Sequence, residues 1–383
     1  MNEKVMIVFG TRPEAIKMCP VVLALKKIPQ IETVVCVTGQ HKEMLDQVLE
    51  NFSIVPDFDL AIMKPGQSLD EITRKILKNV TVTLEKVDPD IVLVHGDTTT
   101  AFASALACFY KGIPVWHVEA GLRTYNLHSP FPEEMNRQAV DIVAGMHFAP
   151  TAQARENLLM EGKNDGTIVV TGNTGIDSLF YMINKEFISP LLEAAKNRKI
   201  ILLTTHRREN IGSAMMNIFS AVRRIADDFN DVYVIYPVHL NPAVKDEAEK
   251  MLSGHPQIAL TQPLDVFQFQ NILARSTLVL TDSGGIQEEA SALKIPVLVM
   301  RDTTERPEGI ASGGLKLAGT SEQGIYEACK NLLTDRNAYE KMSSAVNPFG
   351  DGRASDRIAE TVKKYFGLSG EAEVIADACS ETK

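Results

Sequence analysis

The sequence predicts an α/β fold made of two doubly wound domains, each built around a parallel sheet. Short runs rich in Val, Ile and Leu alternate along the chain with longer amphipathic stretches, a pattern typical of β–α units in a parallel sheet. The turn-rich segment TGNTG at 171–175 interrupts this alternation, which then starts again. The 383 residues also exceed one ordinary domain, because domains usually contain about 100–200 residues.

Five strands are predicted in the first half. Each is almost continuously apolar, as expected for parallel strands with helices on both faces. These strands are VMIVFG (5–10), TVVCVTG (33–39), IVLVHGD (91–97), PVWHVEAG (114–121) and GMHFAP (145–150). Amphipathic stretches such as AIKMCPVVLALKKI (15–28) and TTAFASALACFYKG (99–112) predict the helices between them.

The second half repeats the pattern. It restarts with the segments KIILLTTHRREN (199–210), VYVIYPVHLNP (232–242), QIALTQPL (257–264), STLVLTDSGG (276–285), PVLVMRDTTERPEG (296–309) and LKLAGTS (315–321). We therefore expect a first domain at 1–172 and a second at 173–366. The last helix of the second domain is expected to pack back on the first. Residues 367–383 are expected to form an acidic tail.

Composition narrows the function classes. The formal net charge of −10 and the pI near 5.4 argue against nucleic acid or an anionic membrane as the main partner. No apolar stretch approaches the roughly 20 residues of a membrane span, and the first ten residues lack the apolar region of a signal peptide. The five cysteines are scattered and fit neither a disulfide framework nor a C-x-x-C metal site. We expect a cytoplasmic protein.

Ligands of open α/β sheets collect at the carboxyl ends of the strands, so the residues after each strand are informative. GTRPEAIK follows the first strand. Gly10 would let the backbone approach a ligand, Arg12 could bind a phosphate bidentately, and Lys17 would add a point charge. The alternative is that Arg12 and Lys17 are solvated charges at the start of a helix.

Carboxylates follow the next strands of the first half. Asp97 ends HGD, and because the threonines after it can cap the next helix, Asp97 is left for function. Glu119 closes an apolar strand, where a carboxylate is costly unless it is paired. Glu133 and Glu134 lie on the proline-rich segment SPFPEEMNR, where one of them could simply favour a helix N-terminus.

Features typical of anion binding follow strands of the second half. His206 and Arg207 in TTHRREN form a positive mouth, and His239 occupies the same topological position after the next strand. The Ser-Gly-Gly turn of TDSGGIQEEA opens a helix, where backbone amides bind phosphate. Glu288 and Glu289 follow about one turn later, roughly 6–8 Å along the axis, and could bind ribose hydroxyls. A phosphate and a ribose together indicate a nucleotide.

Nine segments together carry a resemblance to a known family. They are FGTRPEAIKM, HGDTTT, HVEAGLRT, SPFPEEMNR, THRREN, YPVHLNP, TDSGGIQEEA, MRDTTERPEG and NPFGDGRAS. From about residue 4 to residue 365, the chain resembles the non-hydrolysing UDP-N-acetylglucosamine 2-epimerases. These enzymes have two Rossmann-like domains of the GT-B type, with the active-site cleft between them.

The resemblance implies interconversion of UDP-N-acetylglucosamine and UDP-N-acetylmannosamine without NAD, metal or any other cofactor. In this family UDP is eliminated together with the C2 proton, and it adds back to a 2-acetamidoglucal after C2 is reprotonated on the other face. The resemblance makes Asp97, Glu119 and Glu133 the acid/base candidates, and His206 would assist departure of UDP. The positions that match UDP contacts are Arg12, Lys17, Leu264, Phe269, Ser283, Gly284, Gly285, Glu289 and Arg306. Phe269 could stack on the base or pack in the core.

The resemblance also implies a homodimer. Some family members bind a second UDP-N-acetylglucosamine as an activator, and Gln40, Arg207 and His239 match that site. Glu43 and Gly66 stand where those members have Gln and Arg. The alternatives are a hydrolysing epimerase that releases N-acetylmannosamine and UDP, a GT-B glycosyltransferase, and a catalytically silent nucleotide-sugar sensor. The carboxylates on the first domain favour the epimerase.

Overall fold

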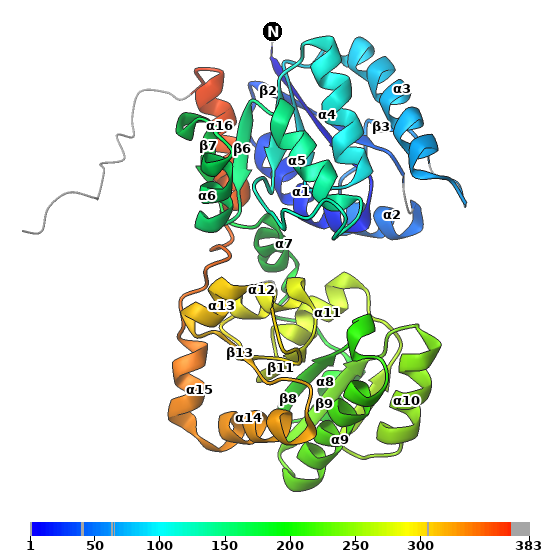
Figure 1. Ribbon diagram of the computed structural model, residues 1–383, viewed down its shortest axis with the longest axis vertical. Coiled ribbons are helices and arrows are strands. Elements are labelled where there is room, and N and C mark those ends of the chain that lie inside the picture. The colour runs from blue at the N-terminus through cyan, green and yellow to red at the C-terminus, as the bar shows by residue number, and fades with distance from the viewer. Residues whose placement is uncertain (1, 40–41, 63, 65, 305, 369–383) are drawn as a thin grey trace, which may run out of the picture.

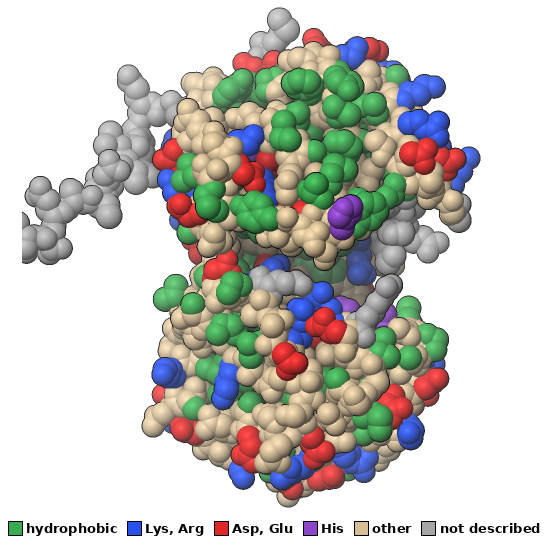
Figure 2. All heavy atoms as spheres, in the orientation of Figure 1, with side chains coloured by type: hydrophobic (Ala, Val, Ile, Leu, Met, Phe, Trp, Pro, Cys, Tyr) green, Lys and Arg blue, Asp and Glu red, His purple; other side chains and the backbone are tan. Residues whose placement is uncertain are grey.

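Two lobes, each built around one sheet, make up the protein (Figure 1). The computed structural model describes residues 2–39, 42–62, 64, 66–304 and 306–368. All strand pairs within the two sheets are parallel. The predicted α/β fold with two Rossmann-like units is therefore confirmed. Figure 2 shows a narrow waist between the lobes, with charged side chains at its rim.

The first lobe contains a seven-stranded sheet in the order β3-β2-β1-β4-β5-β6-β7. Its strands are β1 Glu3–Phe9, β2 Ile31–Val37, β3 Phe58–Asp59, β4 Ile91–His95, β5 Val115–Val118, β6 Met146–Ala149 and β7 Ile168–Val170. Its helices are α1 Arg12–Lys26, α2 Lys42–Asn51, α3 Leu69–Val87, α4 Thr99–Lys111, α5 Glu133–Val143 and α6 Ala152–Met160, with a 3-10 turn at Asp165–Thr167.

The second lobe contains a six-stranded sheet in the order β10-β9-β8-β11-β12-β13. Its strands are β8 Lys199–Thr204, β9 Val232–Pro237, β10 Ile258–Thr261, β11 Leu278–Thr281, β12 Val297–Val299 and β13 Leu315–Leu317. The remaining helices are α7 Thr174–Met182, α8 Pro190–Ala195, α9 Ser213–Asp228, α10 Pro242–Leu252, α11 Val266–Leu273, α12 Gly284–Ala292, α13 Pro307–Ser312, α14 Glu322–Thr334, α15 Arg336–Ser343 and α16 Ala354–Tyr365, with a 3-10 turn at Arg208–Asn210.

Both faces of each sheet are covered, which explains the continuous apolar runs of the strands. In β1, Val5, Ile7 and Phe9 belong to the core on one face, whereas Met6 and Val8 belong to the core on the other. Two further clusters flank the second sheet in the same way. All eleven strands predicted from apolar runs are present, so periodicity located the central strands correctly.

Two short edge strands were not predicted. β3 has two residues and β7 has three, and they form the two edges of the first sheet. Such short segments carry no readable period, and their place is decided by pairing with β2 and β6. The hydrophobicity of the sequence alone therefore does not predict these two strands.

The chain passes between the lobes twice, once between β7 and β8 and again before α16. These two segments touch, because the backbone N–H of Asn173 donates to the carbonyl of Phe349 at 2.8 Å. After the second crossing, α16 packs on α1 and α7 beside the first lobe (Figure 1). Ile358 and Val362 of α16 lie in the core of the first sheet. The domain boundaries at 172–173 and 366–367 stay predictions.

Candidate active site

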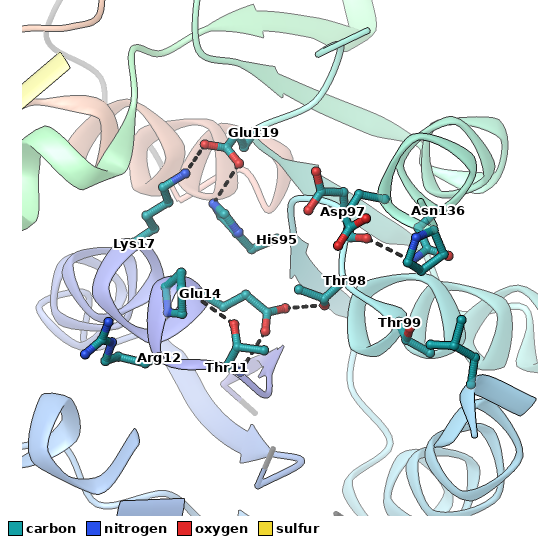
Figure 3. A pocket seen from close by; sticks show the side chains of 14 residues that line it. Thr11, Arg12, Glu14, Lys17, His95, Asp97, Thr98, Thr99, Glu119 and Asn136 are labelled. Atoms are coloured by element: carbon teal, nitrogen blue, oxygen red, sulfur yellow. Dashed lines mark hydrogen bonds and ion pairs between the residues drawn. The ribbon is translucent and has the colours of Figure 1, made fainter. Parts of the chain in front are cut away.

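The main cavity lies where β1, β4 and β5 end and has a volume of about 550 Å³. It opens at the carboxyl edge of the first sheet, the place at which α/β proteins bind ligands. Figure 3 shows how the turns after these strands direct their side chains toward it. The five catalytic and UDP-binding residues predicted in the first half all line it, namely Arg12, Lys17, Asp97, Glu119 and Glu133.

Lys17 and Glu119 form an ion pair across the cavity wall (Figure 3). Burial alone would raise the pKa of Glu119, but Lys17 and His95 outweigh it and lower that pKa to about 2. Burial alone would lower the pKa of Lys17, and Glu119 reverses this so that the pKa is raised. Both groups are therefore charged at neutral pH, and the pair would have to open for Glu119 to receive a proton.

The backbone of Glu119 is held in an unusual conformation. Its φ of 67° lies in the left-handed region, which costs a residue other than glycine about 1–2 kcal/mol. Such strain persists where the surroundings demand it, and it is common at functional sites. Two residues on, Gly121 has a φ of 85°, and a Cβ there would lie 2.2 Å from the carbonyl oxygen of Ala154. The turn after β5 therefore admits only glycine at 121 and aims Glu119 into the cavity.

Asp97 has a different electrostatic environment. Burial and the negative charge of Glu119 raise its pKa to about 6, although Arg137 opposes this. Nη1 of Arg137 lies 3.2 Å from Oδ2 of Asp97, and Nδ2 of Asn136 donates to the Asp97 carbonyl at 2.9 Å. Two carboxylates in one cavity thus have pKa values shifted in opposite directions. Environments that separate two acids in this way are typical of acid/base sites.

The raised pKa of Asp97 predicts a pH-dependent stability difference. A carboxyl whose pKa rises from 3.8 to about 6 on folding binds protons more tightly in the native state. Its contribution to stability is therefore lost as pH rises through that window. We expect Asp97→Asn to gain about 1–2 kcal/mol relative to the wild type between pH 4.5 and pH 7.5. Urea unfolding of both proteins at the two pH values measures this. An equal difference at both would show that Asp97 ionises as in the unfolded chain.

The adjacent glutamates of SPFPEEMNR have separate roles. Glu134 is fully buried and accepts hydrogen bonds from the backbone N–H groups of Thr124 and Tyr125, at 3.0 and 2.9 Å, and from Arg137. It therefore holds the loop that leads into α5. Glu133 is half-buried and lines the cavity, and its side chain makes no hydrogen bond or ion pair with any described residue. The acid of this pair that can meet a ligand is Glu133.

The turn after β1 mainly stabilises the start of α1, whereas the sequence predicted that Gly10 would lie against a ligand. A Cβ on Gly10 would lie 2.0 Å from Oγ1 of Thr38, so side chains of the protein occupy the space predicted for a ligand. Glu14 is buried and accepts hydrogen bonds from the N–H groups of Gly10 and Thr11, which completes a capping box at the start of α1. Arg12 is exposed at the cavity and has no partner among the described side chains.

In the second lobe, a residue that the sequence analysis passed over organises the predicted positive loop. Asp282 is fully buried after β11 and accepts hydrogen bonds from the N–H groups of His206 and Arg207, each at 3.0 Å. It also accepts from Thr205 and Asn210, both at 2.9 Å. Burial lowers the pKa of His206, although Asp282 opposes this. The signal was present in the sequence, because Asp282 follows an apolar strand as Asp97 does.

The Ser-Gly-Gly turn begins α12 as predicted. Ser283 is the N-cap, and its side chain makes no capping hydrogen bond with the described residues. Gly285 is exposed, and nothing lies within 4 Å of the place a Cβ would take. The first amides of a helix have no acceptor within it, and Gly284 and Gly285 contribute such amides. This end of the helix is therefore open to an anion.

The two glutamates of α12 are also distinct. Glu288 is buried and binds Arg306 and the Asn173 side chain. Burial, reinforced by Glu288, raises the pKa of Glu289 to about 7. A smaller cavity of about 50 Å³ is lined by Glu119 from the first lobe and by Glu288 and Arg306 from the second. Arg306 therefore reaches the junction between the lobes, next to Glu119.

The other predicted residues that the structure describes line neither of these two cavities. Leu264 and Phe269 pack against the core of the second sheet, which is the alternative considered for Phe269. The His206 and His239 rings are stacked, with centroids 5.6 Å apart and planes 17° apart. Arg207 follows His206, so Arg207 and His239 lie just after the ends of the neighbouring strands β8 and β9. Gln40 lies outside the described residues.

A buried ionic network supports the first-lobe turns from beneath and was not predicted. Asp141 of α5 is fully buried and lies 2.6 Å from Nδ1 of His117 and 2.7 Å from Nη2 of Arg123. It also accepts the N–H of Gly121 at 3.2 Å. Nε2 of His117 lies 2.7 Å from the Gly96 carbonyl. The network thus joins the turn that carries Asp97 to the turn that carries Glu119.

Comparison with known proteins decides the family. A family model described as UDP-N-acetylglucosamine 2-epimerase matches residues 23–363. The UDP-N-acetylglucosamine 2-epimerase of Bacillus subtilis is 57% identical over 364 residues, which cover 95% of this chain and 96% of that protein. The chain belongs to the UDP-N-acetylglucosamine 2-epimerase family. This membership supports 2-epimerase activity on UDP-N-acetylglucosamine.

Solved structures of the family agree with the fold and contain nucleotide ligands. The S. aureus protein MnaA, solved with UDP, is 49% identical, with a TM-score of 0.86 over 96% of this chain and 98% of that one. The Neisseria meningitidis epimerase bound to UDP-N-acetylglucosamine is 48% identical, with a TM-score of 0.83 over 94% of this chain and all of that one.

Within the described ranges, no group of three or more His, Cys, Asp and Glu side chains is arranged to hold a metal ion. None of the described helices is both long and apolar enough to cross a bilayer. The four described cysteines are buried and unpaired. The expectations of no cofactor and of a cytoplasmic location stay predictions.

Proposed function

We propose that the protein interconverts UDP-N-acetylglucosamine and UDP-N-acetylmannosamine without hydrolysis, by eliminating UDP to a 2-acetamidoglucal and adding it back. The observation that carries the proposal is the cavity in which Asp97, Glu119 and Glu133 meet. Epimerisation at C2 requires a base on one face of the sugar and an acid on the other. The raised pKa of Asp97 and the lowered pKa of Glu119 give this cavity carboxylates that differ in their tendency to hold a proton.

The UDP side of the proposal rests on groups of both lobes. Arg12 and Lys17 line the main cavity, Arg306 lies at the junction, and the open amides of α12 lie in the second lobe. Cations and amide donors aimed at a diphosphate stabilise the charge that develops on it as it leaves C1. Glu289, with its raised pKa, is proposed to bind the ribose, and the His206 loop held by Asp282 to assist departure.

The deciding experiment is proton NMR of UDP-N-acetylglucosamine with the purified protein in D2O. We expect an equilibrium mixture of two UDP-sugars, both carrying deuterium at C2, because the proton is exchanged during elimination and return. Free N-acetylmannosamine with stoichiometric UDP would instead show that water captures the intermediate. That result would replace the proposal with the hydrolysing alternative.

Glu133→Gln is expected to lower kcat by about 10²-fold and to leave the inhibition constant of UDP within about tenfold. The reason is that Glu133 lines the cavity without a partner, so its loss removes proton transfer and little structure. Initial rates from coupled or NMR assays measure the change. Glu156→Gln, an exposed carboxylate of α6 paired with Arg155, is the control and should match the wild type. A Glu133 variant with normal turnover would exclude its acid/base role.

An exposed apolar patch on the first lobe bears on how the protein assembles. Exposed apolar side chains gather on α4 and α5 of the first lobe, including Phe109, Tyr110 and Ile142, which are 60%, 67% and 73% exposed. Figure 2 shows hydrophobic side chains gathered on this lobe. Patches of this kind commonly bind another protein, and we propose that a second copy of the chain covers it in a cytoplasmic homodimer. The product would supply synthesis of a surface polysaccharide or glycan.

A further inference from the structure

His95 is a buried side chain of the main cavity that has no assigned role. It is the last residue of β4, it is 4% exposed, and it lines the cavity beside Glu119 (Figure 3). Neither ring nitrogen has a hydrogen-bond partner among the described residues. Oε2 of Glu119 lies 3.7 Å from Nε2, beyond hydrogen-bond distance. Buried polar atoms are nearly always hydrogen-bonded, and an exception at a ligand cavity indicates a partner that arrives with the ligand.

The charge of His95 limits what that partner can be. Burial lowers its pKa to about 3, because the opposing effect of the Glu119 charge is smaller than that of burial and is itself countered by Lys17. The ring is therefore neutral at physiological pH and presents one N–H donor and one acceptor nitrogen. A neutral ring gives a diphosphate no compensating charge, and it has little tendency to exchange a proton near pH 7. It suits an uncharged polar group.

The location of His95 selects among the uncharged groups of the substrate. His95 pairs in register with Val118, the residue before Glu119, and it precedes Asp97 by two residues. These two carboxylates are the proposed acid/base groups for the proton at C2. A sugar whose C2 reaches them must also place the substituent of C2 against the same wall. That substituent is an acetamido group, which is uncharged and has one N–H donor and one carbonyl acceptor.

We propose that His95 binds the 2-acetamido group of the substrate and so makes the site selective for N-acetylated sugars. This inference rests on the proposed function. His95 contacts the substrate without transferring a proton. Its contact holds the C2 substituent while the proton is removed from one face and returned to the other.

The test compares His95→Leu, which removes both polar atoms, with His95→Gln, which keeps a donor and an acceptor near Nε2. We expect His95→Leu to raise KM for UDP-N-acetylglucosamine about three- to tenfold, the value of one neutral hydrogen bond. kcat should stay within about threefold, because a binding contact made equally in ground and transition states changes KM alone. His95→Gln should recover most of the affinity.

Two inhibitors separate the acetamido contact from other roles. UDP lacks the sugar, and UDP-2-deoxyglucose lacks any polar substituent at C2, so the inhibition constants of both should stay within about twofold in His95→Leu. A comparable rise for UDP-2-deoxyglucose would place the contact elsewhere on the sugar and overturn the assignment. A kcat loss of about 10² or more with one limb of the pH profile removed would make His95 an acid or base instead.

His147 supplies a matched control. It is also buried, its pKa is also lowered by burial, and its Nδ1 also lacks a described partner, but it lies on β6 outside the cavity. His147→Gln should leave KM unchanged, whatever it does to stability. Deuterium exchange at C2 by the wild type is measured first. Its absence would remove the proposed function itself, whereas exchange together with a normal KM in His95→Leu would overturn only the role of His95.

Discussion

Asp97→Asn is expected to lower kcat by about 10³–10⁴-fold while the inhibition constant of UDP changes by less than about tenfold. Asp97 lies in the cavity with a pKa raised to about 6, so it can take up and release a proton near neutral pH. Asparagine preserves the shape and the contact with Arg137, but it cannot exchange a proton. Initial rates with UDP-N-acetylglucosamine, together with UDP inhibition, measure the two effects separately.

The control for this substitution is Asp231→Asn, an exposed aspartate that pairs with Lys199 at 3.0 Å. It should behave as the wild type. Near-normal turnover in Asp97→Asn would transfer the proton chemistry to Glu119 and Glu133. Loss of UDP affinity by much more than tenfold would mean instead that Asp97 supports nucleotide binding or the shape of the cavity.

The central part of the fold could be predicted because its signal is local. A strand covered on both faces must be apolar at every position, as Val5 to Phe9 are, and this holds whatever the strand pairs with. β3 is different, because Phe58 and Asp59 form a strand only through their pairing with Cys36 and Val37. Edge strands of this length depend on a partner that is remote in the sequence.

For the candidate site, the positions of the functional side chains could be predicted, but their protonation states could not. Parallel strands end at one edge of a sheet, so reading the residue after each strand identified Asp97 and Glu119 as neighbours. The ion pair of Glu119 with Lys17, which are 102 positions apart, sets its protonation and has no local signal. The same holds for Asp282 and His206, which are 76 positions apart. Sequence patterns located the groups, whereas their protonation states required the three-dimensional contacts.

Asp141→Asn is expected to cost about 3–5 kcal/mol of stability in the first lobe. The carboxylate is fully buried and is shared by His117, Arg123 and the N–H of Gly121. Its neighbours lower its pKa against the effect of burial, so it is charged in the native state. Removing the charge leaves the buried Arg123 guanidinium with Glu161 as its remaining carboxylate partner, and the loss of a buried ionic partner costs more than the loss of an exposed pair.

The single tryptophan allows the stability of the first lobe to be measured separately. Trp116 is buried in β5 next to His117, so its fluorescence during urea unfolding reports the first sheet. Asp70→Asn breaks an exposed ion pair with Arg74 on α3 and should change the midpoint little. If Asp141→Asn unfolded within about 1 kcal/mol of the wild type, the network would contribute little net stability. A normal Trp116 transition with lowered turnover would show that the network acts mainly by aiming the Asp97 and Glu119 turns.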